Sequence, residues 1–207
     1  MPHKFIIEAN EYIIKNIQSF YNSEYSGGGG RRQANGTIEN TVCTLKNDVT
    51  PFTKTVLDDT VQQLRGILKK DLPEVLQFTK LKSLTVCVVP RAKVNYNQNQ
   101  LLFKSTVHTV ASQLFGFNDG TDFIIRHTDT RTTHRDRAGY GGNGDLPYRG
   151  ITKNTCTISN YVKGKNILLI DDLYSKSINI DEDAIQALIE KGANRVFFYA
   201  IGRTVRK

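Results

Sequence analysis

The chain has 207 residues, of which 39% are hydrophobic and 23% are charged. A chain of this length and balance forms one domain, or one domain with an appendage, and buries its core without disulfide support. Its longest apolar runs fall far short of the roughly 20 residues that span a membrane. Because Glu8 comes too early for a signal peptide, we expect a soluble, cytoplasmic protein that does not act in a membrane.

The 28 basic and 20 acidic side chains give a net charge of +8, which suggests an anionic partner. Residues 1–119 and residues 120–207 each hold 14 basic and 10 acidic side chains, so the charge does not form a basic tail that clamps nucleic acid. A small phosphate-rich ligand therefore fits at least as well as DNA or RNA. Cys43, Cys87 and Cys156 lack the paired spacing of a zinc site, and we assign them structural or incidental roles.

The first 80 residues are predicted to be largely helical. Residues 5–21 carry apolar side chains at roughly helical spacing, at Ile6, Ile13, Ile17 and Phe20. The glycine-rich stretch 26–32 could cradle a phosphate, but a plain connecting loop is favoured because no strand-to-helix context surrounds it. Residues 57–69 form an apolar stripe and predict a second helix, which Pro73 is expected to limit.

From residue 83 onward, short apolar strands alternate with helices. The predicted strands are 84–89, 122–126, 166–170 and 195–201, and the predicted helices are 101–115 and 181–191. Asn179 could cap the last helix, with Glu182 completing a variant capping box. This alternation predicts an α/β fold with a parallel sheet, whose ligand crevice lies beyond the carboxyl ends of the strands. The long polar loop 128–150 is typical of an active-site cover.

Two adjacent carboxylates, Asp171 and Asp172, follow the predicted strand 166–170. Two carboxylates are costly to hold close together unless a cation or a diol engages them, and Mg²⁺ and sugar hydroxyls are suitable partners. The loop that follows leads into a helix N-terminus, where free N–H groups favour a phosphate. The pattern therefore indicates a phosphorylated ribose. The alternative is that both aspartates simply end a strand and begin a solvated turn.

Residues 167–179 resemble the phosphoribosyl pyrophosphate (PRPP) motif of type I phosphoribosyltransferases, which is an apolar strand, D-D-x-x-T-T-G-x-[ST] and a helix. Four further stretches resemble the ComF-like branch of that family, in the same order: Pro90-Arg91-Ala92-Lys93 after the first strand, Tyr96-Asn97-Gln98 in place of F-N-Q, Arg126 with Asp129 and Thr130 in place of R-x-x-D-T, and Gly202-Arg203-Thr204 in place of A-R-T. The resemblance covers about residues 83–205.

The resemblance implies a type I phosphoribosyltransferase-like fold, with a parallel sheet flanked by helices in residues 81–207. Residues 1–80 would form a helical N-terminal hood segment or a dimer surface, and a homodimer is expected. The implied reaction is the Mg²⁺-assisted displacement of pyrophosphate from the anomeric carbon of PRPP by an unknown, nitrogenous small-molecule acceptor.

The resemblance also assigns roles to individual residues. Asp171 and Asp172 would hold the ribose hydroxyls and engage the metal, directly or through water. The 5′-phosphate would be surrounded by Ser175, Lys176, Ser177 and Asn179. Arg91 and Lys93 would face the pyrophosphate, and the other PRPP-binding residues would be Arg126 and Tyr174. The loop 131–150 would close over the site and supply charge from Arg131, His134, Arg135 and Arg137.

The chain departs from the family pattern at three points. Ser175-Lys176-Ser177 replaces T-T-G, and a lost glycine restricts the backbone of a phosphate loop. Asn179 replaces the final hydroxyl residue, and the cysteine zinc module that usually precedes this domain is not found. An alternative from another class therefore stays open, namely a non-catalytic PRPP or nucleotide sensor, or a nucleic-acid-associated protein, on the same fold.

Overall fold

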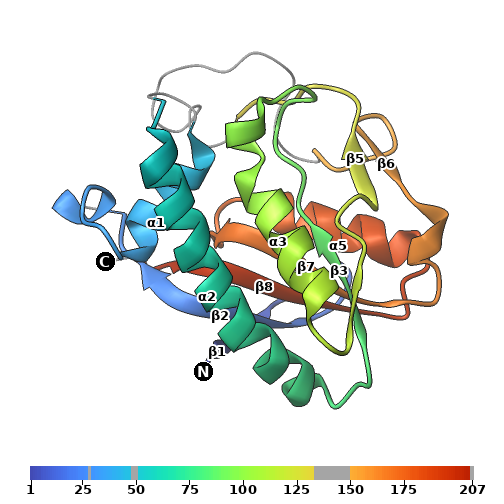
Figure 1. Cartoon of the computed structure of the whole chain (residues 1–207). Helices are drawn as coiled ribbons and strands as arrows, with labels where there is room; N and C mark the ends of the chain where they lie inside the picture. The colour runs from blue at the N-terminus through green and yellow to red at the C-terminus, as the bar shows by residue number, and fades with distance from the viewer. Residues whose placement is uncertain (28, 48–50, 133–149, 206–207) are drawn as a thin grey trace.

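The structure is a computed structural model that describes residues 1–27, 29–47, 51–132 and 150–205. In these residues the chain forms a six-stranded sheet with the strand order β1-β2-β8-β7-β3-β4, and within it only the β1–β2 pair is antiparallel (Figure 1). A separate antiparallel pair joins β5 and β6. The strands are β1 (His3–Ile7), β2 (Ile17–Tyr25), β3 (Leu84–Val88), β4 (Phe117–Asp119), β5 (Ile124–Arg126), β6 (Cys156–Ile158), β7 (Asn166–Tyr174) and β8 (Arg195–Thr204). The predicted α/β class with a mostly parallel sheet is confirmed.

Helices cover both faces of this sheet. One face packs against α1 (Ile38–Lys46), α2 (Lys54–Thr79) and α3 (Leu102–Gln113), and the other face packs against α5 (Ile180–Glu190). Three short 3-10 turns complete the described elements: η1 (Gly29–Arg32), η2 (Gln98–Gln100) and η3 (Asn160–Val162). The predicted helices 101–115 and 181–191 are thus confirmed as α3 and α5.

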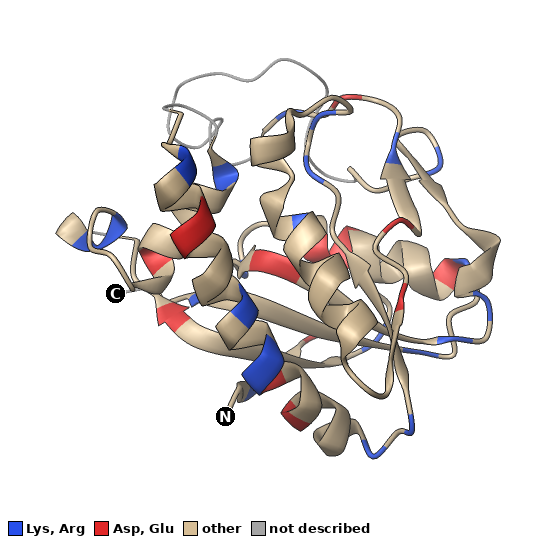
Figure 2. Cartoon of the chain, viewed as in Figure 1, with Lys and Arg blue, Asp and Glu red and all other residues tan. Residues whose placement is uncertain are grey.

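Figure 2 shows Lys and Arg spread over most elements and interspersed with Asp and Glu. None of the helices in the described part of the chain combines the length and the apolar character that crossing a membrane requires.

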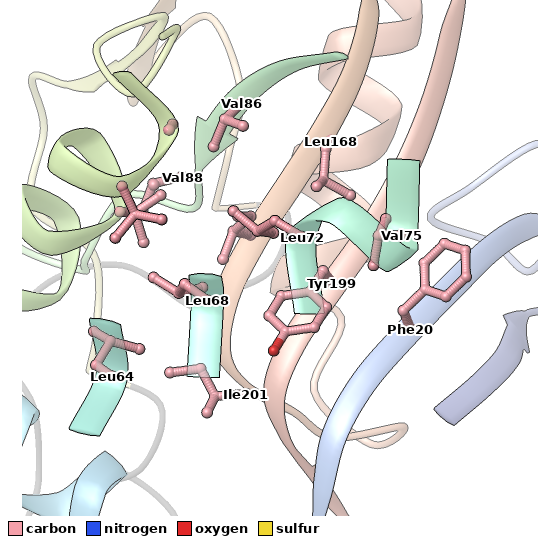
Figure 3. Close-up of a cluster of buried hydrophobic side chains, with 14 of the residues drawn as sticks. Phe20, Leu64, Leu68, Leu72, Val75, Val86, Val88, Leu168, Tyr199 and Ile201 are labelled. Carbon is pink, nitrogen blue, oxygen red and sulfur yellow. The ribbon is translucent and has the colours of Figure 1, made fainter. Parts of the chain in front are cut away.

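The core follows from the alternation of side chains along the central strands. In β7, Leu168 and Ile170 pack toward α1–α3, whereas Ile167 and Leu169 pack toward α5. Figure 3 shows how Leu68 and the neighbouring side chains of α2 meet the side chains of β3, β7 and β8 in the first of these two clusters. Because residues 167–170 of β7 are buried on both faces, they form a continuous apolar run, and that run made the strand predictable.

The N-terminal region differs from its prediction. Residues 5–21 do not form a helix, because β1 and β2 form a hairpin that extends the sheet beside β8. The side chain of Asn10 folds the turn between them, since its Oδ1 accepts hydrogen bonds from the backbone N–H groups of Tyr12 (2.8 Å) and Ile13 (3.1 Å). The expected helical hood is therefore limited to α1 and α2, which lie over the sheet rather than apart from it.

The prediction that Pro73 limits the second helix is wrong. The helix α2 continues through this residue to Thr79. Proline removes the hydrogen bond to the carbonyl four residues earlier, here that of Lys69. Pro73 and Lys69 are both exposed, so water can replace that hydrogen bond, while the buried Leu72 and Val75 keep the helix packed on the core.

The order of the parallel strands reverses between β3 and β7. The chain passes from β3 through α3 to β4 on one side, and from β7 through α5 to β8 on the other. Such a reversal leaves a crevice beyond the carboxyl ends of the two central strands. The predicted strand 122–126 does not join this sheet: its residues 124–126 pair with β6, and β4 takes the place beside β3.

Candidate functional site

A cavity of about 330 Å³ lies beyond the carboxyl end of β3 and along the last residues of β7, where the strand order reverses. Its walls come from the segment after β3, the end of β7 with the loop to α5, residues 130–132, and the ends of α1 and β8. A wider depression of about 650 Å³ lies beside α5 and β6, away from these strand ends. We take the smaller cavity as the candidate site because it lies where the strand order reverses and contains Asp171 and Asp172.

Asp171 and Asp172 both line this cavity, but they are not beyond the strand as predicted. The strand β7 continues to Tyr174, and Asp171 still pairs with Ala200 of β8. On the other side, β3 ends opposite Ile170, so the edge of β7 that carries the two aspartates is open. The two carboxylates therefore lie at the open edge of a central strand.

The two carboxylates have partners on opposite faces of the sheet. Asp172 points toward α1, where its Oδ1 lies 3.1 Å from Nζ of Lys46. Asp171 points toward α5, and its side chain is hydrogen-bonded to that of Asp181. The Oδ1 atom of Asp171 also accepts a hydrogen bond from the backbone N–H of Asp172 (2.8 Å). One aspartate thus pairs with a cation and the other with a second acid.

The acid pair changes the electrostatics of the cavity. Burial and then the negative charge of Asp172 raise the pKa of Asp171 to about 7. Burial and the neighbouring Asp171 raise the pKa of Asp181 well above its usual value. Asp181 is 3% exposed, and its Oδ1 has no hydrogen-bond partner among the described residues. Burial by itself lowers the pKa of Lys46, but the carboxylates of Asp172 and Asp171 more than offset this and raise it.

Arg91 and Arg126 line the cavity, yet their guanidinium groups also hold the loop after β3 in place. Arg91 donates to the carbonyls of Gln100 (2.6 Å) and Lys46 (3.0 Å), and it stacks over the ring of Tyr96 at 4.2 Å. Arg126 donates to the carbonyls of Arg91 and Gly150, the latter at 3.1 Å, and burial lowers its pKa. Both arginines are thus engaged by main-chain oxygens within the wall of the cavity.

The loop between β7 and α5 brings only part of the predicted phosphate site to the cavity. Ser175 lines it, and its Oγ accepts a hydrogen bond from Oγ1 of Thr204 at 3.0 Å. Lys176 is exposed and pairs instead with Glu8, with 3.3 Å between Nζ and Oε2, outside the cavity. Ser177 does not line the cavity.

The other predicted residues of this segment do not line the cavity. Tyr174 is buried on the α5 face and donates to Oε1 of Glu182 at 3.1 Å. Asn179 is the N-cap residue of α5, but its side chain makes no capping hydrogen bond. The predicted capping box with Glu182 is therefore wrong, because the carboxylate of Glu182 is engaged by Tyr174.

The remaining predicted residues divide into three groups. Arg131 lines the cavity with Thr130 and Thr132. Lys93 does not line it, and its Nζ lies 3.9 Å from Oδ2 of Asp129. Three residues of the expected catalytic loop lie outside the described residues: His134, Arg135 and Arg137.

Sequence reasoning missed Lys46, Asp181 and Thr204 as members of the site. Lys46 had no signal, because α1 was not predicted, whereas Asp181 was visible only as an acid in the first turn of a helix. Among the described residues, no group of three or more His, Cys, Asp or Glu side chains is arranged to hold a metal ion. A comparison of the sequence with protein-family models finds no match, and neither does a comparison with curated proteins.

Proposed function

We propose that this cavity binds PRPP and that the protein transfers its ribose 5-phosphate to a nitrogenous acceptor, with release of pyrophosphate. One observation carries the proposal. Asp171 and Asp172 line a single cavity at the open edge of a central parallel strand, where the strand order reverses. Carboxylates accept strong hydrogen bonds from hydroxyl groups, so this edge suits a ribose diol.

The surroundings of the two aspartates support a phosphorylated sugar. Ser175 follows β7, Thr204 ends β8, and both line the cavity. Because Thr204 donates its hydroxyl proton to Ser175, the hydroxyl group of Ser175 is left to donate to a phosphate oxygen. Arg131 also lines the cavity and contributes positive charge. The spread of Lys and Arg in Figure 2 also agrees better with a small anionic ligand than with a long nucleic acid.

Mg²⁺ fits the chemistry of these side chains, because carboxylate oxygens are the ligands it prefers and Oδ1 of the buried Asp181 lacks a partner. Asp171 and Asp172 would hold the ion, directly or through water, and it would neutralise charge on the departing pyrophosphate. Since the described acids do not form a complete metal site, the ion would arrive with the diphosphate of the ligand.

In the proposed reaction, the lone pair of the acceptor nitrogen forms a bond to the anomeric carbon. The bond from that carbon to the diphosphate oxygen breaks, pyrophosphate leaves with the electron pair, and the acceptor nitrogen loses its proton to solvent. The two carboxylates would fix the ribose in place and stabilise the positive charge that develops on the ring. Catalysis would therefore rest on positioning and electrostatics.

Calorimetric titration with PRPP and Mg²⁺ tests this proposal. We expect Asp171→Asn and Asp172→Asn each to lower the affinity about tenfold or more, since each removes a charge-assisted hydrogen-bond acceptor. The matched control is Asp122→Asn, whose carboxylate is 77% exposed and pairs with Lys104 at 2.6 Å, outside the cavity. Unchanged affinity in both site variants would contradict the proposal.

A second candidate is a protein that binds PRPP or a nucleotide without turnover. It is favoured by the position of Lys176, which pairs with Glu8 outside the cavity, and by the loop 175–177, which lacks the glycine of the family motif. A pyrophosphate-release assay with PRPP, Mg²⁺ and a panel of free bases and ammonia separates the two. Release with one acceptor indicates the transferase, whereas binding without release for every acceptor indicates the sensor.

A further inference from the structure

The ammonium group of Lys46 lies at the cavity although it comes from a distant part of the chain. It is the last residue of α1, its side chain is 28% exposed, and its Nζ is 3.1 Å from Oδ1 of Asp172. This ion pair joins the helix to the central strand. The lysine thus lies beside a carboxylate that the proposed function assigns to a ribose hydroxyl.

Several hydrogen bonds fix the backbone of this lysine against the site. Arg91 donates from Nη2 to the carbonyl of Lys46 (3.0 Å) and from Nη1 to that of Gln100 (2.6 Å). Gln100 in turn donates from Nε2 to the carbonyl of Asn47 (3.4 Å). The end of α1 is therefore tied to the segment after β3, and the ammonium group is held at the cavity rather than reaching it from a free loop.

The geometry leaves Lys46 able to bind an anion. An ammonium group carries three N–H donors, and the contact with Asp172 uses one of them. The guanidinium groups of Arg91 and Arg126, in contrast, donate to main-chain carbonyls. The family resemblance assigned the pyrophosphate contact to Arg91 and Lys93. Lys46 suits that contact better, because Lys93 does not line the cavity and Arg91 donates to main-chain carbonyls.

We propose that Lys46 binds the diphosphate of the ligand and makes the site selective for a sugar that carries a diphosphate beside a free hydroxyl. In PRPP the diphosphate is on the anomeric carbon and the next ring carbon carries a hydroxyl. If that hydroxyl of PRPP donates to Asp172, the neighbouring diphosphate comes to lie next to the ammonium group of Lys46, which contacts the same carboxylate. This inference rests on the proposed function and assigns its diphosphate contact.

The test compares three probes, each titrated in the presence of Mg²⁺: PRPP, ribose 5-phosphate and inorganic pyrophosphate. Lys46→Met should weaken PRPP and pyrophosphate about tenfold to a hundredfold, because a hydrogen-bonded charge pair is lost. Its effect on ribose 5-phosphate should stay within about threefold, and Lys46→Arg should recover most of the lost affinity. Lys104→Met is the control, since Lys104 forms an exposed ion pair outside the cavity.

The outcomes separate this inference from the proposed function. Equal loss of PRPP and ribose 5-phosphate would mean that Lys46 only positions Asp172, and unchanged affinity for PRPP would also overturn the inference. A third outcome is possible, in which Lys46→Met weakens pyrophosphate binding but Asp171→Asn and Asp172→Asn leave PRPP binding unchanged. That result would support the diphosphate contact of Lys46 and contradict the ribose contacts of the proposed function. Circular dichroism checks the fold of each variant, and Lys46→Gln replaces Lys46→Met if the latter does not fold.

Discussion

The acid pair of the site makes the stability of the protein depend on pH. Burial and the charge of Asp172 raise the pKa of Asp171 from 3.8 to about 7, so the folded state holds this proton more tightly than the unfolded chain. The cost of ionising Asp171 is absent below about pH 4, grows as the pH rises, and is complete above about pH 7. The expected slope is at most about 1.4 kcal/mol per pH unit, and the whole effect is on the order of 4 kcal/mol.

Asp171→Asn removes this titration, so the variant should gain stability relative to the wild type as the pH rises. The assay is urea unfolding of the ligand-free protein at several pH values between about 4 and 8, with the free energy of unfolding compared at each. The control, Asp122→Asn, should follow the wild type in parallel, because its carboxylate is exposed and lies outside the acid pair. If the free energy of unfolding of Asp171→Asn also changes with pH in parallel with that of the wild type, the pKa of Asp171 is not raised in the folded protein.

Three further predictions concern the core. Leu68 is fully buried under the sheet, so Leu68→Ala should lower the free energy of unfolding by about 2–5 kcal/mol in urea, and a loss below about 1 kcal/mol would contradict its packing. Tyr199→Phe should cost about 1–3 kcal/mol in the same assay, because its hydroxyl donates to Oδ2 of the buried Asp71 at 2.8 Å; equal stability would show that this hydrogen bond is unimportant. Burial raises the pKa of Cys87 to about 12, so a thiol reagent should label the half-buried Cys43 well before Cys87 in the native protein, and the reverse order would refute this.

The sequence predicts those elements whose hydrophobic and charge pattern matches the burial that the segment has in the fold. The run 166–170 is apolar because β7 is buried on both faces, and the acidic first turn of α5 matches the dipole of that helix. Residues 5–21 behave differently. Their helix-like spacing spans two strands and a turn, and Ile6, which a helical stripe would bury, is 53% exposed. Residues 17–25 form a strand because they pair with β8, which lies far away in the sequence. The pattern within residues 5–21 does not predict that pairing.

The same division holds at the site. The pair Asp171 and Asp172 was visible because it interrupts an apolar run, and the structure brings both residues to the cavity. Lys176 carried an equally local signal, but its ammonium group lies outside the cavity, beside Glu8 in the turn after β1. Lys46 could not be found from the sequence, because its position depends on hydrogen bonds from Arg91 to the end of a helix that was not predicted.

Thermal unfolding of the wild type and of Asp171→Asn, with and without PRPP and Mg²⁺, tests the central claim most directly. At about 100 times its Kd, a ligand adds about 2.7 kcal/mol of stability, which for a chain of this size raises Tm by roughly 5–10 °C. We predict this rise for the wild type and at most about half of it for the variant at the same PRPP concentration, because a tenfold loss of affinity lowers the stabilisation to about 1.4 kcal/mol. An equal rise in both proteins, or none in the wild type, would contradict a PRPP site built on the carboxylates of β7.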